Sequence, residues 1–230
     1  MRDAIRVDCL SSEFRRFRMK TLFSRACSFL LIALASAAVS AQPVAGREYR
    51  VIDPPRPLAR SERIEVIEFF SYGCPVCYAA EPYLTRWKAK REAEIELKRI
   101  PSPLPAAWAP FARLYYALEA IGLLERLHWP VFDNHHFDGR RLNSETNLLE
   151  WLGRNDVDVL LVKQAMDSPE VAAKVATARA LLDTYDVEGV PTFVIDGRYF
   201  TTARLAGGVP EVVEVVDFLV ERAREERGKK

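Results

Sequence analysis

Apolar positions along the chain change their spacing twice, which predicts three successive parts. The first part contains a β-branched and aromatic run from Val66 to Phe70, which is typical of a short buried strand. From residue 101 to residue 185 the apolar residues follow helical spacing in five segments. Strands return from Gly189, and an amphipathic helix opens at Pro210. The predicted order is therefore two strands, a helix, a strand, five helices, two strands and a helix.

Turn and capping residues set the expected boundaries of these elements. Strands are predicted at residues 49–52, 66–70, 94–100, 189–195 and 198–201, and helices at 74–92, 111–121, 123–137, 143–152, 156–166, 168–185 and 210–220. Asp196 and Gly197 predict a two-residue hairpin turn. Pro82 is expected to kink its helix and Pro130 to interrupt another. The stretch from Glu221 to Lys230 is expected to be a frayed, solvated tail.

The strongest candidate site is the pair Cys74 and Cys77, within the stretch 64–82. Residues 71–73 end the preceding strand, and Pro75 suits the first position of a helix, so we expect a helix to open at Cys74. A sulfur atom at a helix N-terminus lies among unpaired backbone N–H groups, which favours the reactive thiolate. Cys77 lies on the same side of the first turn, so the two sulfurs can close and reopen a small disulfide ring.

These features resemble a known redox site. The order strand, CxxC and helix, with Pro82 five residues after the second cysteine, resembles the thioredoxin superfamily, and the run VIEFFSYGCPVCY is similar to the DsbA family. The resemblance implies an α/β protein with a thioredoxin fold and an inserted all-helical domain. The expected thioredoxin-like parts are residues 42–100 and 186–224, the helical domain is 101–185, and 225–230 is a charged tail.

The resemblance also implies roles for the residues around the cysteines. Cys74 is expected to be the exposed cysteine of low pKa and Cys77 its inner partner. A cis-proline at Pro191 would face the pair, and the backbone of Val190 would pair with an extended substrate segment. Pro75 and Val76 complete the expected substrate-binding set. Without the resemblance, an ordinary trans proline that opens a strand is the alternative interpretation of Val190-Pro191.

Glu68 is the third expected catalytic residue. A carboxylate inside an apolar strand is costly to bury, so it is either solvated or retained for a function. It matches the buried acid of the family, which moves protons to and from the inner cysteine. A cationic partner from Lys98 or Arg99 is plausible but poorly aligned.

Several other side chains remain open to two interpretations. Tyr72, Tyr78 and Tyr83 could form an apolar rim for substrate or could be packing residues. His135 and His136 could bind a metal, but a polar surface loop is the simpler interpretation. The CxxC pair could be half of a zinc site, although the chain has only four cysteines and three histidines to supply the rest. We therefore predict no metal and no cofactor other than the disulfide itself.

Residues 1–41 have the three parts of a secretory signal peptide. A basic stretch is followed by an apolar run at 29–39 and by small residues before a cleavage site after Ala41. Met19 could be the true start, and an uncleaved membrane anchor is the alternative to cleavage. We expect export to the periplasm.

Removal of this leader leaves a simple cysteine content. Cys9 and Cys27 would be lost, so Cys74 and Cys77 would be the only cysteines of the mature chain. A chain that used cysteines as structural cross-links would normally carry more, so one redox-active pair in an oxidising compartment is indicated.

Without the seven basic and three acidic residues of the leader, 26 basic and 29 acidic residues remain. This small acidic excess gives no reason to expect a nucleic-acid partner.

The sequence thus predicts a periplasmic thiol:disulfide oxidoreductase that donates disulfides to reduced exported polypeptides and acts as a monomer. The resemblance implies reoxidation by a DsbB-type, quinone-linked protein of the inner membrane. Many DsbA proteins have histidine where this chain has Val76, and loss of that donor should make the oxidase weaker. A reductase or isomerase of the same superfamily, or a non-catalytic peptide-binding chaperone, remains the alternative.

Overall fold

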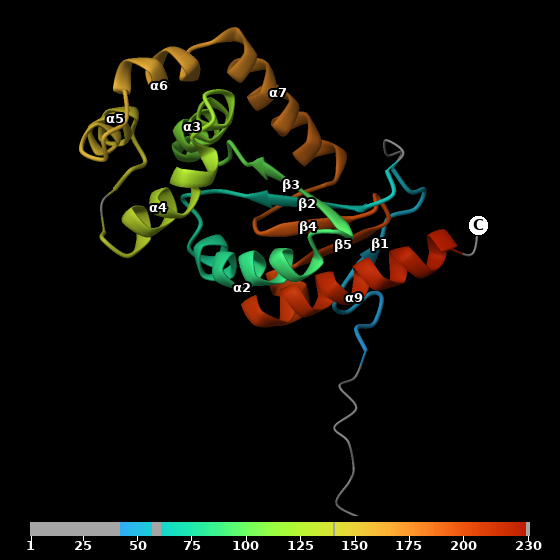
Figure 1. Cartoon of the computed structure of the whole chain (residues 1–230). Helices are drawn as coiled ribbons and strands as arrows, with labels where there is room; N and C mark the ends of the chain where they lie inside the picture. Colours follow the sequence, from blue (N-terminus) through green and yellow to red (C-terminus); the bar gives the residue numbers. More distant parts are fainter. Residues whose placement is uncertain (1–41, 57–60, 140, 229–230) are drawn as a thin grey trace, which may run out of the picture. The chain divides into compact units, whose positions relative to one another are not determined.

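The computed structural model describes residues 42–56, 61–139 and 141–228 (Figure 1). The expected signal peptide at residues 1–41, with its cleavage site, lies outside these residues. None of the described helices is both long enough and apolar enough to cross a lipid bilayer.

A five-stranded mixed sheet forms the centre of the described chain. Its strands are β1 (Arg50–Val51), β2 (Ile64–Phe70), β3 (Ile95–Pro101), β4 (Thr192–Ile195) and β5 (Tyr199–Thr202), in the order β1-β5-β4-β2-β3. β2 pairs in parallel with β3, and the other pairs are antiparallel. The turn between β4 and β5 has positive φ at both Asp196 (54°) and Gly197 (61°), which confirms the predicted hairpin.

Helices cover both faces of this sheet. α2 (Pro75–Arg91) and α9 (Val209–Gly228) lie side by side on one face, where Val66, Leu84 and Val216 share a core (Figure 1). The C-terminal end of α7 (Pro169–Thr184) covers part of the other face through Leu182. The short helix α8 (Ala203–Ala206), which the sequence analysis did not predict, follows β5.

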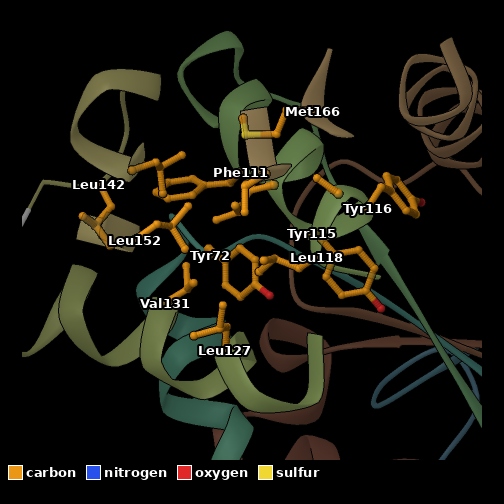
Figure 2. Close-up of a cluster of buried hydrophobic side chains, with 14 of the residues drawn as sticks. Tyr72, Phe111, Tyr115, Tyr116, Leu118, Leu127, Val131, Leu142, Leu152 and Met166 are labelled. Carbon is orange, nitrogen blue, oxygen red and sulfur yellow. The ribbon is translucent and has the colours of Figure 1, made fainter. Parts of the chain in front are cut away.

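A helical block interrupts the sheet between β3 and β4. It contains the 3₁₀ helix η1 (Ala106–Trp108) and the helices α3 (Ala109–Ala120), α4 (Leu124–His136), α5 (Glu145–Gly153), α6 (Val159–Met166) and α7. Large side chains from these helices meet in one core, which also includes Tyr72 from the loop before α2 (Figure 2). The thioredoxin-like sheet with an inserted helical region is thus present.

Side-chain caps explain where three of these helices begin. Ser144 accepts the N–H of Asn147 at 3.2 Å, and Ser168 accepts the N–H of Val171 at the same distance. The fourth helix of the block, α6, begins at Val159, three residues later than predicted, because Asp158 caps it. Asp156 instead has φ of 55°, a left-handed conformation outside a helix.

Two predicted irregularities are absent from the described helices. Pro130 lies inside α4, which is continuous, so the predicted interruption is wrong. The carbonyl of Arg126, which loses its N–H partner at the proline, belongs to an exposed residue and can bind water. The predicted frayed tail is also wrong as far as Gly228, because α9 continues to that residue.

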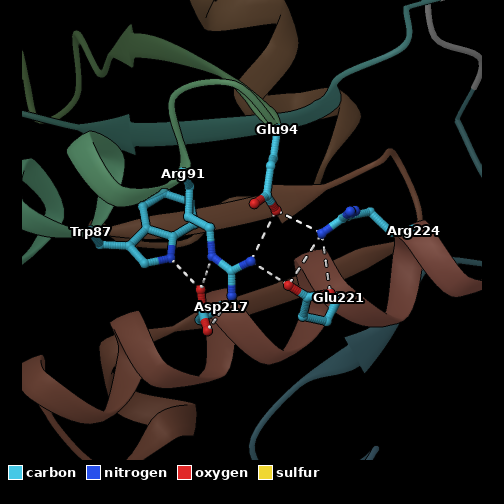
Figure 3. A network of polar contacts seen from close by, with 6 residues as sticks. All are labelled: Trp87, Arg91, Glu94, Asp217, Glu221 and Arg224. Carbon is cyan, nitrogen blue, oxygen red and sulfur yellow. Dashed lines mark hydrogen bonds and ion pairs between the residues drawn. The ribbon is translucent and has the colours of Figure 1, made fainter.

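Ion pairs keep the last turns of α9 in place. Arg91 of α2 donates Nε and Nη2 to the two carboxylate oxygens of Asp217, at 2.8 and 2.9 Å (Figure 3). Its Nη1 contacts Glu94 and Glu221, and Glu94 also accepts from Arg224 at 2.7 Å. The charged residues that suggested a solvated tail therefore join α9 to α2 and to the start of β3.

Replacement of Arg91 tests this connection. We expect Arg91→Ala to lower the free energy of unfolding by about 1 to 2 kcal/mol, because it removes a bidentate pair and leaves Asp217 with fewer donors. Arg154→Ala is the matched control. Both side chains of the Arg154–Glu150 ion pair are exposed, so the pair should contribute only about 0.3 kcal/mol to the free energy of unfolding. Urea unfolding measures the free energy of unfolding of both variants. An equal decrease in the two variants would contradict the structural role of Arg91.

Candidate active site

The two cysteines lie where the sequence analysis placed them, at the start of α2. Cys74 is the N-cap residue, with φ −93° and ψ 116°, and Pro75 is the first helical residue. The Sγ atom of Cys74 accepts the backbone N–H of Cys77 at 3.2 Å. Both cysteines are present as free thiols. The helix therefore begins at the outer sulfur, as its proline and the broken strand predicted.

The exposure of the pair differs from the prediction. Cys74, expected to be exposed, keeps only 4% of its surface accessible, compared with 1% for Cys77 and 40% for Val76 between them. The Val190-Pro191 peptide bond is cis, as the resemblance implied. As a thiol, Cys74 donates to the carbonyl oxygen of Val190 at 3.4 Å. This backbone segment lies against the outer sulfur and shields it.

The surroundings shift the two thiols in opposite directions. The pKa of Cys74 is lowered, chiefly because the thiol of Cys77 donates a hydrogen bond to its sulfur and the N–H groups of Val76 and Cys77 add to this. The pKa of Cys77 is raised well above its ordinary value, first by burial and then by the neighbouring charges of Cys74 and Glu68. Of the two sulfurs, the outer one therefore ionises more readily.

Glu68 lies buried in the middle of β2, only 1% exposed. The parallel register places it directly opposite Arg99 of β3, whose Nε donates to its carboxylate at 3.0 Å. The expected poor alignment of this cation was therefore wrong. Burial raises the pKa of Glu68 to about 7, against the opposing effect of the Arg99 charge. Its charge acts on both cysteines, so the structure brings all three predicted catalytic residues together.

A second buried carboxylate, Glu81, was missed in the sequence. It lies one helical turn after Cys77, and Nη2 of Arg99 donates to it at 2.7 Å. Arg99 therefore lies between two buried carboxylates, Glu68 and Glu81. The spacing of Cys77 and Glu81, four residues apart on one helix face, is a signal that could have identified it.

The histidines of α4 have structural partners. His135 and His136 are the last residues of α4, not part of a polar loop, so that expectation was wrong. His136 contacts the carbonyl oxygen of Tyr72 through Nε2 at 2.8 Å, and His135 accepts the N–H of Leu142 at 3.1 Å. Across residues 42–56, 61–139 and 141–228, no group of three or more metal-ligating side chains converges.

The three tyrosines near the site have different environments. Tyr72 is fully buried, and its ring contacts Phe132, so it is a packing residue. Tyr78 is partly exposed and stacks on Trp129, with the ring centroids 5.4 Å apart. Tyr83 is 39% exposed, so Tyr78 and Tyr83 remain candidates for an apolar rim.

A groove begins at Val76, the exposed residue between the two cysteines. Its volume is about 500 Å³, and its lining includes Val76, Val190, Pro191 and Phe200. Arg50 lies over the ring of Phe200, with its guanidinium carbon 4.1 Å from the ring centroid. The lining of the groove thus contains three of the predicted substrate-contacting residues, Val76, Val190 and Pro191, of which Val76 is exposed.

A thioredoxin-like sheet, a CxxC pair at a helix start and a facing cis-proline define the class of thiol:disulfide oxidoreductases. Residues 106–210 match the family described as DSBA-like thioredoxin domain. The chain is 33% identical over 206 residues to the thiol:disulfide interchange protein DsbA of Burkholderia cepacia, covering 87% of this chain and 97% of the relative. It is 32% identical over 197 residues to DsbA of Azotobacter vinelandii, covering 84% and 92%.

Solved structures agree with these sequence relationships. The crystal structure of Pseudomonas aeruginosa DsbA superposes with a TM-score of 0.75 at 31% identity, over 82% of this chain and 97% of that one. The oxidoreductase DsbA from Xylella fastidiosa gives a TM-score of 0.73 at 29% identity, over 80% and 100%. The chain belongs to the DsbA family and is a thiol:disulfide oxidoreductase.

The raised pKa of Glu68 makes stability depend on pH. The carboxyl of Glu68 holds its proton more tightly in the folded protein than in the unfolded chain. Its contribution to the free energy of unfolding is therefore complete below the ordinary pKa of 4.5 and is lost as pH rises through about 7. Glu68→Gln cannot release a proton, so its stability relative to wild type should increase across this range by on the order of 2 kcal/mol.

Urea unfolding of the reduced protein at a series of pH values measures this difference. Glu62→Gln, at an exposed position, controls for the loss of one carboxylate. A constant difference between Glu68→Gln and wild type from acid to alkaline pH would show that Glu68 does not titrate in this range.

Proposed function

We propose that this oxidoreductase donates its disulfide to reduced exported polypeptides in the periplasm. The observation that carries the proposal is the opposite shift of the two thiols, with the pKa of Cys74 lowered and that of Cys77 raised. Stabilisation of the outer thiolate favours the reduced pair, and a pair that is stable when reduced gives its disulfide away readily. The established family membership supports the same direction.

Disulfide transfer proceeds in two exchange steps. A substrate thiolate attacks Sγ of Cys74, the Cys74–Cys77 bond breaks, and Cys77 leaves as a thiolate with the electron pair. A second substrate thiolate then attacks the substrate sulfur of the mixed disulfide and expels Cys74 as a thiolate. The substrate loses two electrons and the enzyme pair gains them.

Glu68 supplies the proton that the inner cysteine needs. Cys77 is buried, so its thiolate is costly in that position and must be protonated. Glu68 is a carboxyl whose pKa of about 7 allows it to hold a proton at neutral pH. It gives this proton to the thiolate of Cys77, becomes a carboxylate and later regains a proton from water.

Substrate binds as an extended segment against the cis-proline. The backbone of Val190, beside Cys74, pairs with the segment, while Pro75, Val76 and Pro191 contact its side chains. Main-chain pairing supports a broad range of substrates, because it does not depend on sequence.

The remaining parts of the proposal concern the cell. Residues 1–41 are a signal peptide, and the exported chain is a monomer with thioredoxin-like parts at 42–100 and 186–224 around a helical domain at 101–185. A DsbB-type, quinone-linked protein of the inner membrane takes two electrons and two protons from the reduced pair. No cofactor other than the Cys74–Cys77 disulfide takes part.

Two single substitutions test the order of the exchange steps. Cys74→Ser should abolish oxidation of a dithiol peptide, because the attacked sulfur is gone. Cys77→Ser, offered a peptide that already contains a disulfide, should accumulate a mixed disulfide at Cys74, because the Cys74 thiolate attacks the peptide disulfide and no inner thiol is left to release the bound peptide. Non-reducing gels and mass spectrometry measure both outcomes, with Arg154→Ala, at an exposed position of the helical block, as an active control. An enzyme that still oxidised the peptide after Cys74→Ser would exclude this mechanism.

The equilibrium with a glutathione buffer tests the direction of electron flow. We expect the Cys74–Cys77 pair to be more oxidising than glutathione, and Val76→His to shift the equilibrium further toward the reduced pair by roughly threefold to tenfold, because it adds a donor near the outer thiolate. Val76→Ala should shift it little. A pair more reducing than glutathione would identify a reductase instead.

A further inference from the structure

His128 of α4 lies beside the buried carboxylates and takes no part in the exchange steps. It is 8% exposed, and aromatic rings surround it, with Tyr72 and Phe132 at centroid distances of 5.3 and 5.4 Å. Its Nδ1 atom is 2.8 Å from the hydroxyl oxygen of Tyr72. Its Nε2 atom faces Oε1 of Glu81 at 3.5 Å and has no closer polar partner in the described part of the chain.

These two contacts determine which ring nitrogen of His128 carries the proton. If Nδ1 donated to Tyr72, the lone pair of Nε2 would face a carboxylate that already accepts from Arg99 and Thr85, which is repulsive. If the Tyr72 hydroxyl donates to Nδ1, an N–H at Nε2 points toward the anion. The second arrangement is favoured as long as Glu81 is ionised. At 3.5 Å this contact is a long hydrogen bond from a neutral N–H to an anion.

The buried cluster holds one cation for two carboxylates. If Glu68 and Glu81 were both ionised, Arg99 would leave one negative charge uncompensated in the interior, which is costly. The two carboxyl groups therefore hold one proton between them at neutral pH. The carboxyl group with fewer hydrogen-bond donors around it carries that proton. Glu81 receives Arg99, Thr85 and the N–H of His128, whereas Arg99 is the donor to Glu68.

We propose that His128 is a positioning residue that keeps Glu81 ionised and thereby assigns the proton of the buried pair to Glu68. The hydrogen bond from His128 is the largest influence that lowers the pKa of Glu81. The charges of Glu68 and Cys77 act on each other, and the proposed function takes the proton for the inner thiolate from Glu68. This inference deepens the proposed function and rests on the proton transfer from Glu68 to Cys77.

The charged groups that face His128 come from three elements. Glu81 lies on α2, Arg99 on β3 and Glu125 one turn earlier on α4. Tyr72 and Tyr115 are the neighbouring titratable rings, and burial raises the pKa of both. Burial also lowers the pKa of His128, so the imidazole is neutral in this environment.

Carbon-13 NMR of the glutamate side-chain carboxyls in the reduced full-length protein tests the assignment. Glu68→Gln and Glu81→Gln identify the two signals. In wild type, Glu68 should titrate near neutrality and Glu81 at clearly lower pH. In His128→Leu the midpoint of Glu81 should rise by at least about one pH unit, a tenfold gain in proton affinity, and that of Glu68 should fall.

His128→Gln is the matched control, because its amide can still donate to Glu81 and should return both midpoints to near their wild-type values. An unchanged Glu81 midpoint in His128→Leu, or an equal shift in both variants, would overturn the proposal. If His128→Leu fails to fold, the nitrogen-15 shifts of His128 in the unmodified protein decide. A proton on Nε2 supports the assignment, and a proton on Nδ1 overturns it. Neither readout depends on disulfide donation, so failure here is distinguishable from failure of the proposed oxidase function.

Discussion

A single buried guanidinium determines the electrostatics beneath the redox pair. Arg99 lies opposite Glu68 in the parallel register of β2 and β3 and also reaches Glu81 on α2. In an apolar interior two carboxylates and one cation cannot all be charged without a large desolvation cost. The cluster therefore holds a proton close to neutral pH, and in the proposed mechanism this proton passes to the thiolate of Cys77. The position of this cation follows from strand register and helix packing, so the redox chemistry depends directly on the fold.

The inserted helices belong to the active site as well as to their own core. Cys74, Cys77 and Tyr72 share one apolar cluster with side chains from α3 to α7. Figure 2 shows Tyr72 of this cluster among side chains of the inserted helices. Two histidines of α4 contact Tyr72, His128 at its hydroxyl and His136 at its carbonyl. The loop that leads into Cys74 is therefore fixed from the helical side, while the cis-proline loop contacts the sulfur from the sheet side. The helical insertion is continuous in sequence, but its core includes residues of the redox loop.

Local chemistry explains which features the sequence predicts well. The start of α2 follows from Pro75 and the broken strand, and the hairpin follows from Asp196-Gly197, because each depends on residues adjacent in the chain. Glu81 was missed because its role depends on partners from β3 and α4 that only folding brings together. The exposure of Cys74 was overestimated for the same reason, since Val190 covers it from 116 positions away. The charged end of α9 looked solvated because its partner Arg91 lies on another helix.

The residue between the cysteines changes which groups control the response to pH. A histidine at position 76 would titrate close to neutral pH and would make stabilisation of the outer thiolate depend on its own protonation. Val76 has no ionisable group, so Cys74 is stabilised by the thiol of Cys77 and by backbone N–H groups that do not titrate in this range. The pH dependence of exchange near neutrality then passes to the buried pair Glu68 and Glu81. Under the proposed mechanism we expect the buried carboxyl of Glu68, rather than a residue within the CxxC motif, to set how activity varies with pH near neutrality.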